Sequence, residues 1–563
     1  MAFGGDDMNK SVLSLFLAVF LILNVVIFSK AYAIEPNDPG FRVEVGEEEY
    51  VIGPSTHFPD GPFLSVKTNG QLRAYAPSNS TYTFLGDSLD SLSYQGVAIA
   101  PGTAGQFDEC GAWLHSVYKI TENHWIGWHH AEEDCNYTTG ATHKSMGFVE
   151  SYDAGQTWQR PNYPNNQVLT SSNPVNDSTK QDGAGDGVVL KIGDYFYMLY
   201  VEWTDWGTHL ARSRVSDLGK PGTWYKYYNG SFSEPGLGGR STNIVKHILS
   251  STTYNSYLDK ILSIRGWGRT GFYLLIADKN DLTRWNLFPS SPQLAIFPLV
   301  SYLGDKRLDN WWGGLNKDER MQVYAYFSLI GLDGDWNKIG QEFYFYYLKV
   351  FEREDFTQRY LLRRKIKVYK NSQDSYFAKL ALTKYQKDSG QKHKVSVDIA
   401  KPSEGYIKEK QLGYLLPYSQ GGFKPLYECY APSWDDYMIS ASDPSVYNWE
   451  HCENPDGDRF IRTIGWVSET QTDQANVPLY RCFDDVNLDH FASTDPTCNG
   501  ETKESILGYL FSESFKEADT CQHDYTGDGT INISDALYIL AHWATVGIDG
   551  FLGILSGWGV SCG

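Results

Sequence analysis

Short runs of alternating apolar and polar residues fill most of the chain up to about residue 350. Turns rich in Gly, Asn and Asp separate these runs, and this alternation is typical of β-hairpins. The strongest turn signal is Asn69-Gly70, because the two residues adopt the backbone angles of a tight hairpin at low cost. Five hairpin units are predicted, at 62–78, 113–130, 188–203, 258–278 and 320–351.

Three of these units continue in the same way, with a strand, a turn containing Ser or Asp, and then a Trp. They span 147–158, 208–224 and 272–285. Self-similarity on this scale in an all-β sequence predicts a β-propeller, with one unit per blade. An irregular β-sandwich is the alternative.

The composition changes at 350–365, where a dense run of both charges reads as a solvated connector. Three similar segments follow, at 367–378, 425–440 and 478–494, and their units close with 410–416, 462–468 and 505–511. Three copies of about fifty residues favour threefold closure. The predicted fold is therefore all-β, with a five-bladed β-propeller over 34–355 and a β-trefoil-like domain over 366–515.

The N-terminus carries the pattern of a secretory signal peptide over residues 1–33. Lys10 precedes an apolar run at 12–28, and Ala31 and Ala33 form a small-residue cleavage site. An uncleaved membrane anchor is the alternative. Secretion favours pairing of the eight cysteines as disulfides. Sequence neighbours suggest the pairs Cys110–Cys135, Cys429–Cys452, Cys482–Cys498 and Cys521–Cys562.

A net charge of −20 argues against binding to nucleic acid or to an anionic membrane, since both require a basic surface. Aromatic residues make up 15% of the chain, with 17 Trp and 39 Tyr. In a secreted protein, exposed aromatic rings beside carboxylates suit sugars, which stack their C–H faces on rings and hydrogen-bond through their hydroxyls.

The stretch Ser151–Trp158, "SYDAGQTW", resembles the Asp-box of sialidases and related propellers. In those families the box is a structural turn between the outer strands of a blade, remote from the chemistry. The resemblance therefore supports the propeller and implies no activity. A full sialidase pattern would need several boxes and an arginine triad.

The segment 183–203 resembles the blade opening of five-bladed propeller glycosidases, the arabinanase, xylosidase and levansucrase-like group. Asp186 matches the acid that precedes the hairpin in that group, although Gly187 stands where Pro is common. By blade position the resemblance implies Asp60 as base, Asp186 as modulator of the acid's pKa, and Glu234 as proton donor. Glu132 competes with Glu234 for the last role.

Glycoside cleavage needs one carboxyl that holds a proton and another that stays ionised. Each of the four acids has a plain alternative as a turn or cap carboxylate. Other candidates for substrate contact are His129, expected as a polar funnel residue rather than a metal ligand, and Arg265 and Arg269, whose guanidinium forks suit a carboxylate or sulfate. Trp311 and Trp312 are predicted as a sugar platform or as blade core.

The C-terminal stretch "DYTGDGTINISDALYILAHW" has the oxygen spacing of a calcium loop followed by one helix. The predicted ligands are Asp524, Thr526, Asp528, Thr530, Asn532 and Asp535. A loop with only an exiting helix and Asp at position twelve resembles a dockerin repeat, here within 519–563. The resemblance implies structural Ca²⁺ and a cohesin-like scaffold partner, although a second acidic loop is missing. A metal-free polar loop is the alternative.

Together these patterns predict a secreted glycoside hydrolase that acts on polysaccharide by carboxylate acid/base catalysis. Two alternatives stay open: a non-catalytic, lectin-like propeller, and a polysaccharide lyase, which would need a Tyr, His or Lys base beside an Arg or a metal. The expected partners are a polysaccharide and a cohesin-like scaffold, with no nucleic acid and no membrane after removal of the signal.

Overall fold

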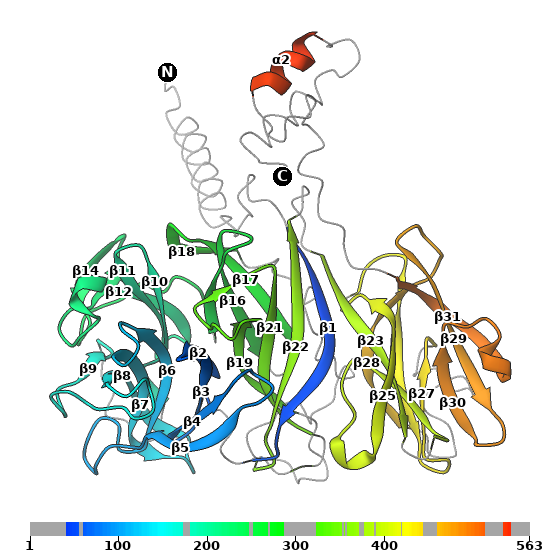
Figure 1. The fold of residues 1–563 in the computed structure, drawn as a ribbon, viewed down its shortest axis with the longest axis horizontal. Coiled ribbons are helices and arrows are strands. Elements are labelled where there is room, and N and C mark those ends of the chain that lie inside the picture. Colours follow the sequence, from blue (N-terminus) through cyan, green and yellow to red (C-terminus); the bar gives the residue numbers. More distant parts are fainter. Residues whose placement is uncertain are drawn as a thin grey trace, which may run out of the picture.

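The computed structural model is mostly β (Figure 1). It describes residues 41–55, 60–172, 181–246, 251–267, 271–286, 323–351, 354, 357–370, 377–387, 390–417, 419–442, 459–512 and 533–541. Among these, no helix is long and apolar enough to cross a membrane. The signal-peptide prediction at 1–33 lies outside the described residues.

Antiparallel pairing forms five runs of strands in the first part of the chain, and a short parallel pairing of 181–183 with 142–144 joins the third run to the second. The first run contains β2 (Leu64–Thr68), β3 (Gln71–Pro77), β4 (Thr81–Gly86) and β5 (Ser93–Ile99). The second contains β6 (Gly111–Lys119), β7 (Trp125–Asn136), β8 (Ala141–Ser151) and β9 (Gln167–Leu169). The third contains β10 (Gln181–Ile192), β11 (Tyr195–Glu202), β12 (Gly207–Arg214), β13 (Tyr225–Tyr228) and β14 (Ser231–Pro235).

The fourth run contains β15 (Ser251–Asn255), β16 (Lys260–Trp267), β17 (Gly271–Asp278) and β18 (Asp281–Asn286), with β20 (Lys338–Ile339) beside β15. The fifth contains β19 (Val323–Gly331), β21 (Glu342–Val350), β22 (Tyr360–Lys370) and β1 (Phe41–Ile52). The predicted hairpins therefore exist. In the first, Asn69 and Gly70 have φ angles of 48° and 80° and form the tight turn, as expected.

Apolar side chains fill the layers between neighbouring runs, and the layers close on themselves. Phe63 of the first run shares a core with Trp125 of the second and Tyr346 of the fifth. Trp128 of the second run packs in one core with Phe196 of the third. Leu210 of the third run packs in another core with Ile261 of the fourth. Ile264 and Phe327 share the core that joins the fourth run to the fifth.

The predicted connector at 350–365 is instead partly the strand β22, which pairs with β21 and β1. Its charges are compatible with a buried strand because each has a partner. Arg363 lies 2.7 Å from Glu49, and Lys367 lies 3.3 Å from Glu342. A run of charged residues therefore indicates a solvated surface only when the neighbouring strands carry no side chains of opposite charge.

Strand β1 joins the two parts of the protein, because its other edge pairs in parallel with β23 (Phe377–Lys387). Figure 1 shows β1 between the first part and the sheets of the last part. Buried charges cross this junction. They form the interface ion cluster: Glu48, Lys349, Arg364, Asp398, Glu428 and Arg462.

The last part contains three strand triplets. They are β23, β24 (His393–Ser396) and β25 (Tyr406–Leu415); β26 (Phe423–Ala431), β27 (Asp436–Ser440) and β28 (Arg459–Ser468); and β29 (Ala475–Asp484), β30 (Asp489–Ser493) and β31 (Thr502–Phe511). In each triplet a long strand pairs with a short one and with a second long one. The first triplet begins at Phe377, ten residues after the start of the predicted first segment at 367.

A histidine–aspartate pair recurs between the triplets. His490 Nδ1 lies 2.6 Å from Asp436 Oδ2, and His393 Nδ1 lies 2.6 Å from Asp489 Oδ2. Burial alone would lower the pKa of His490, but its hydrogen bonds to Asp436 and Glu504 raise this pKa to about 9. The charged imidazole therefore stabilises the domain.

We expect His490→Gln to reduce the stability of the protein mainly below pH 6.5. A folded-state pKa above the unfolded value contributes stability that is complete below the unfolded pKa, near 6.5, and is lost as the pH rises through about 9. Urea unfolding of both proteins from pH 6 to 10 measures the difference. Burial lowers the pKa of Lys226 to about 8, but Lys226 titrates in both proteins, so its contribution cancels in the stability difference between them. A difference that stays constant with pH would contradict the assignment.

The disulfides Cys110–Cys135 and Cys482–Cys498 confirm two of the four predicted pairs. Disulfides of this kind are typical of proteins that fold in an oxidising compartment. Cys452, Cys521 and Cys562 lie outside the described residues, so the other two pairs stay predictions.

Candidate functional site

Four central strands, β2, β6, β10 and β19, begin at the same end of the first part, and three of them are irregular near that end. The pairing register shifts around His115 in β6, around Asp186 in β10 and around Tyr326 in β19. Asp186 and Tyr326 have φ angles of 50° and 56°, in the left-handed region that bulky residues rarely adopt. Bulges of this kind redirect side chains and are frequent beside functional sites.

Glu132, near the end of β7, is buried in a polar setting. Its oxygens lie 3.3 Å from His130 Nε2, 3.3 Å from Lys144 Nζ and 2.9 Å from the Tyr137 hydroxyl. Burial would raise the pKa of Glu132, but the His130 hydrogen bond and the Lys144 charge outweigh it and lower this pKa to about 2. Glu132 is therefore an anion at any physiological pH.

His130 joins Glu132 to Asp186. The Asp186 backbone N–H donates to His130 Nδ1 at 2.9 Å, so the ring proton lies on Nε2 and points at Glu132. A Cβ at Gly185 would lie 2.4 Å from His130 Nδ1, so only glycine allows this approach. Asp186 Oδ1 lies 3.5 Å from the same nitrogen, and the Asp186 side chain is 33% exposed.

Asp60 precedes β2 and lies close to both other acids. Burial raises the pKa of Asp60, and the charges of Glu132 and Asp186 raise it further, against a hydrogen bond from Tyr326 and the charge of Arg359. The backbone of Gly61, next to Asp60, packs closely against the His115 ring, because a Cβ at Gly61 would lie 2.7 Å from His115 Nε2. The His115 ring in turn stacks on His130 at 5.6 Å.

The structure thus brings together three of the four predicted acids, Asp60, Glu132 and Asp186, from three separate runs. Their environments push the pKa values of Asp60 and Glu132 in opposite directions, up and down respectively. Pairs of carboxyl groups separated in this way are typical of acid/base catalysis. The cluster also reaches solvent, because Asp186 is partly exposed and Tyr137 is 58% exposed.

Glu234 lies elsewhere, on the edge strand β14. It forms an ion pair of 2.8 Å with Arg240. The hydrogen bond from Arg240 lowers the pKa of Glu234. A carboxylate held ionised at a sheet edge is poorly suited to donate a proton, so the geometry does not favour the proton-donor role that blade position implied for Glu234.

His129 is fully buried on the opposite face of β7 from His130, with Nε2 3.3 Å from Asp108. Adjacent residues of a strand point to opposite faces, so of the two histidines only His130 contacts the acids. Arg265 lies on β16, opposite Tyr273, and its side chain is outside the described part. Arg269, Trp311 and Trp312 lie outside the described residues altogether.

Most of the predicted calcium loop also lies outside the described residues, including Asp524, Thr526, Asp528, Thr530 and Asn532. Asp535 is described. It is buried in the first turn of α2 (Ile533–Ala541), the place expected for a ligand at position twelve of such a loop. The fit is limited to this one carboxylate, so the calcium site stays a prediction.

Sequence reasoning selected His129 from the neighbouring pair His129-His130, and it missed Lys144, Tyr137 and Tyr326. Strand alternation would have selected His130, because Glu132, two residues further along β7, lies on the same face. No sequence signal marks Tyr326, which reaches Asp60 only because a bulge in β19 redirects it.

The Asp-box turn lies at the other end of β8. Ser151 pairs with Trp125 at the start of β7, seven residues before Glu132. The Asp153 carboxylate accepts hydrogen bonds from the Thr157 N–H at 2.9 Å and the Thr157 hydroxyl at 2.6 Å. Its role is therefore structural, as the resemblance implied.

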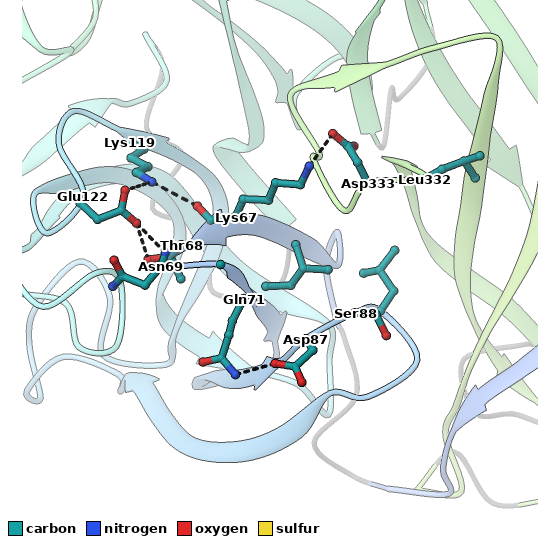
Figure 2. Close-up of a pocket in the computed structure, with 13 residues that line it drawn as sticks. Lys67, Thr68, Asn69, Gln71, Asp87, Ser88, Lys119, Glu122, Leu332 and Asp333 are labelled. Carbon is teal, nitrogen blue, oxygen red and sulfur yellow. Dashed lines mark hydrogen bonds and ion pairs between the residues drawn. The ribbon is translucent and has the colours of Figure 1, made fainter.

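A cavity of about 610 Å³ opens at this other end, beside the β2–β3 turn (Figure 2). Its polar groups are already paired, Lys67 with Asp333 at 3.0 Å, Gln71 with Asp87 at 2.9 Å, and Lys119 with Glu122. It lacks the convergent unpaired polar groups of a ligand site.

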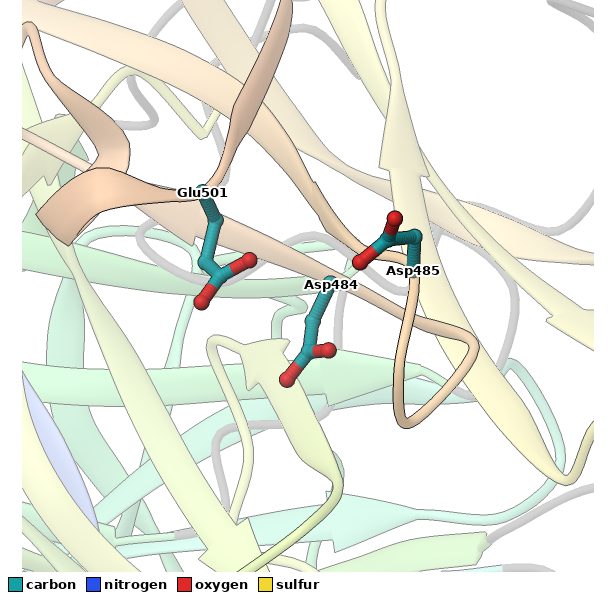
Figure 3. A group of neighbouring side chains, drawn as sticks. All are labelled: Asp484, Asp485 and Glu501. Carbon is teal, nitrogen blue, oxygen red and sulfur yellow. The ribbon is translucent and has the colours of Figure 1, made fainter.

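Asp484, Asp485 and Glu501 form the one group of acids among the described residues that is compact enough for a metal ion (Figure 3). Asp484 already accepts the backbone N–H groups of Val486 and Asn487, which is the geometry of a turn-capping aspartate. A structural role in the turn therefore explains its position.

Neither a protein-family model nor a curated protein matches this chain. Solved structures with a similar fold include a GH62 α-L-arabinofuranosidase catalytic domain from Coprinopsis cinerea, 12% identical, covering 59% of this chain and 98% of that one with a TM-score of 0.35. A GH32 β-fructofuranosidase from Bombyx mori is 10% identical and covers 87% of this chain and 93% of that one, with a TM-score of 0.37. A family 117 glycoside hydrolase from Zobellia galactanivorans is 9% identical and covers 59% and 91%, with a TM-score of 0.34. Likeness at this level assigns neither a family nor an activity.

Proposed function

We propose that the protein is a glycoside hydrolase whose catalytic carboxyl groups are Asp60 and Asp186. The observation that carries this proposal is the cluster itself. Three acids from separate runs meet beside three bulged strands, and the pKa of Asp60 is raised while that of Glu132 is lowered to about 2. Glycoside cleavage needs a protonated and an ionised carboxyl group on the two sides of the scissile bond.

Within this cluster we assign proton donation to Asp60, because burial and two neighbouring anions favour its protonated form. Asp186, partly exposed and in contact with His130, is the partner that acts as base or nucleophile. Glu132 then supplies the negative charge that keeps the proton on Asp60. This differs from the roles implied by blade position, in which Asp60 was the base and Asp186 the modulator.

We infer that the cluster lies in a five-bladed β-propeller followed by a β-trefoil-like domain. The support is the closed succession of cores, in which the fifth run returns to the first, and the three strand triplets of the last part. The N-terminal strand β1 would complete the fifth blade, a closure that ties the two ends of a propeller together.

A polysaccharide lyase is a weaker candidate on the same residues. Such an enzyme would need a tyrosine, histidine or lysine that accepts a proton readily. Burial raises the pKa of Tyr137 and of Tyr326, which makes both poor bases below pH 10. His130 already uses Nδ1 to accept the Asp186 N–H.

We further propose secretion and a C-terminal calcium module. Two disulfides favour an oxidising compartment. The buried Asp535 suits the twelfth ligand of a calcium loop. The cohesin-like partner rests on the sequence resemblance alone.

Reducing-sugar release from a panel of plant and algal polysaccharides tests the hydrolase. We expect release from at least one polymer, and a loss of roughly 10²–10⁴-fold in the Asp186→Asn variant, the usual contribution of one positioned acid or base. Asp333→Asn, at the other end of the strands, is the matched control and should keep full activity. No release from any polymer, with binding retained in a pull-down, would favour the lectin-like alternative.

A further inference from the structure

Two tryptophans lie at the same end of the strands as the candidate acids, in the turn from β11 to β12. The backbone N–H of Trp203 donates to the Gly183 carbonyl at 3.0 Å, which places Trp203 beside the start of β10, close to Asp186. The Trp203 and Trp206 rings meet edge to face, with centroids 4.8 Å apart. Trp203 is half-buried, whereas Trp206 is 49% exposed.

A single cation links this pair to the acids. Lys144 Nζ lies 4.5 Å from the centroid of the Trp203 ring and 3.3 Å from Glu132 Oε1. The aromatic pair is therefore separated from Glu132 by the width of one ammonium group. A sugar chain on Trp206 would lie within a few sugar rings of Asp186.

The turn holds Trp206 in an unfavourable conformation. Its φ angle is 56°, a region in which a bulky residue is uncommon and which Gly or Asn would adopt more easily. The turn is fixed by the Trp206 N–H, which donates to the Glu202 carbonyl at 3.0 Å, and by Asp205, which accepts from Asn243 at 3.1 Å. An exposed indole on a backbone with a strained φ angle does not contribute to the core. Such outliers point to function.

We propose that Trp206, supported by Trp203, is a binding platform for a neutral sugar ring of the substrate polysaccharide, next to the residue whose bond is cleaved. An exposed indole face stacks on the C–H face of a sugar. Asp205, with 43% of its side chain exposed, is placed to accept a hydroxyl. The link to cleavage rests on the proposed hydrolase function, but the binding itself does not.

Affinity electrophoresis in gels that contain arabinan, arabinoxylan, a fructan or agarose tests the platform without turnover, in the Asp186→Asn background. We expect at least one polymer to retard this protein. Trp206→Ala should weaken that binding by roughly 3- to 10-fold, the range of an aromatic contact. Trp206→Phe should retain most of the affinity. Tyr225→Ala, which removes an equally exposed ring on β13, is the control and should change nothing.

A second variant tests whether weaker binding results from loss of the Trp206 ring or from a damaged fold. Trp206→Gly removes the ring and relieves the positive φ angle, so its melting temperature should equal or exceed that of the parent while its binding is as weak as that of Trp206→Ala. Binding that is unaffected by loss of the Trp206 ring, or no retardation by any polymer, would overturn the platform. Retardation that depends on Trp206, together with no sugar release by the wild-type protein on any of these polymers, would keep the platform and refute the hydrolase.

Discussion

Asp60→Asn is expected to lower kcat by roughly 10²–10⁴-fold on whichever polysaccharide the protein cleaves. An amide cannot release a proton, so the leaving oxygen would depart without protonation. The fold should persist, because Asn keeps the size of the side chain and can still accept the Tyr326 hydrogen bond. The initial rate of reducing-sugar release, beside a thermal melt of the same sample, separates lost chemistry from lost structure.

The pH profile decides which role Asp60 has. The negative charge of Glu132 raises the pKa of Asp60. Glu132→Gln, nearly the same in shape, removes that charge and should move the limb of the kcat/KM profile that belongs to Asp60 to lower pH. If Asp60 is the acid, as we propose, the alkaline limb moves; if it is the base, the acidic limb moves. A profile that does not move, or an active Asp60→Asn variant, would remove Asp60 from the mechanism.

The contrast between His129 and His130 shows which parts of the site the sequence could predict. The blade-opening pattern pointed to Asp60 and Asp186, and the strand end pointed to Glu132, because such positions depend on local sequence. Side-chain direction depends on strand alternation, which places His130 rather than His129 against Glu132. The Tyr326 contact depends on pairing between distant strands and a bulge, which no local pattern encodes.

The same distinction holds for the fold. Hairpins and the threefold repeat were predictable because each depends on turn residues and periodicity within about fifty residues. The strand β22 was not, since its charges are acceptable only beside Glu49 and Glu342 on neighbouring strands. The first triplet was misaligned by about ten residues because 367–370, which looks like its start, ends the fifth run instead.

Asp398→Ala is expected to reduce the free energy of unfolding by about 3–5 kcal/mol, the usual cost of leaving buried charges without their partner. The interface ion cluster is balanced, with three acids, Glu48, Asp398 and Glu428, against Lys349, Arg364 and Arg462. Asp398 is 3% exposed; it accepts from Tyr324 at 2.7 Å and from Arg364 at 2.8 Å, and it pairs with Arg462. Its removal leaves an excess cation inside the junction between the first and last parts.

Urea unfolding at pH 7 measures this loss, with Asp333→Ala as the matched control. Asp333 pairs with Lys67 on the surface, where both side chains are more than half exposed, so its loss should cost at most about 1 kcal/mol. The pH dependence of this loss follows from the charges around Asp398. The neighbouring cations hold the pKa of Asp398 far below its usual range despite burial. A depressed carboxyl pKa contributes stability above pH 3.8 that is lost as the pH falls below that value. The difference in unfolding free energy between wild type and Asp398→Ala should therefore be full at pH 7 and shrink on acidification below pH 4.

Because the cluster lies between β1, β21, β22 and the last part, we also expect the variant to unfold in two steps, with the two parts no longer coupled. A single transition shifted by less than 1 kcal/mol would mean that β1 pairing alone holds the parts together.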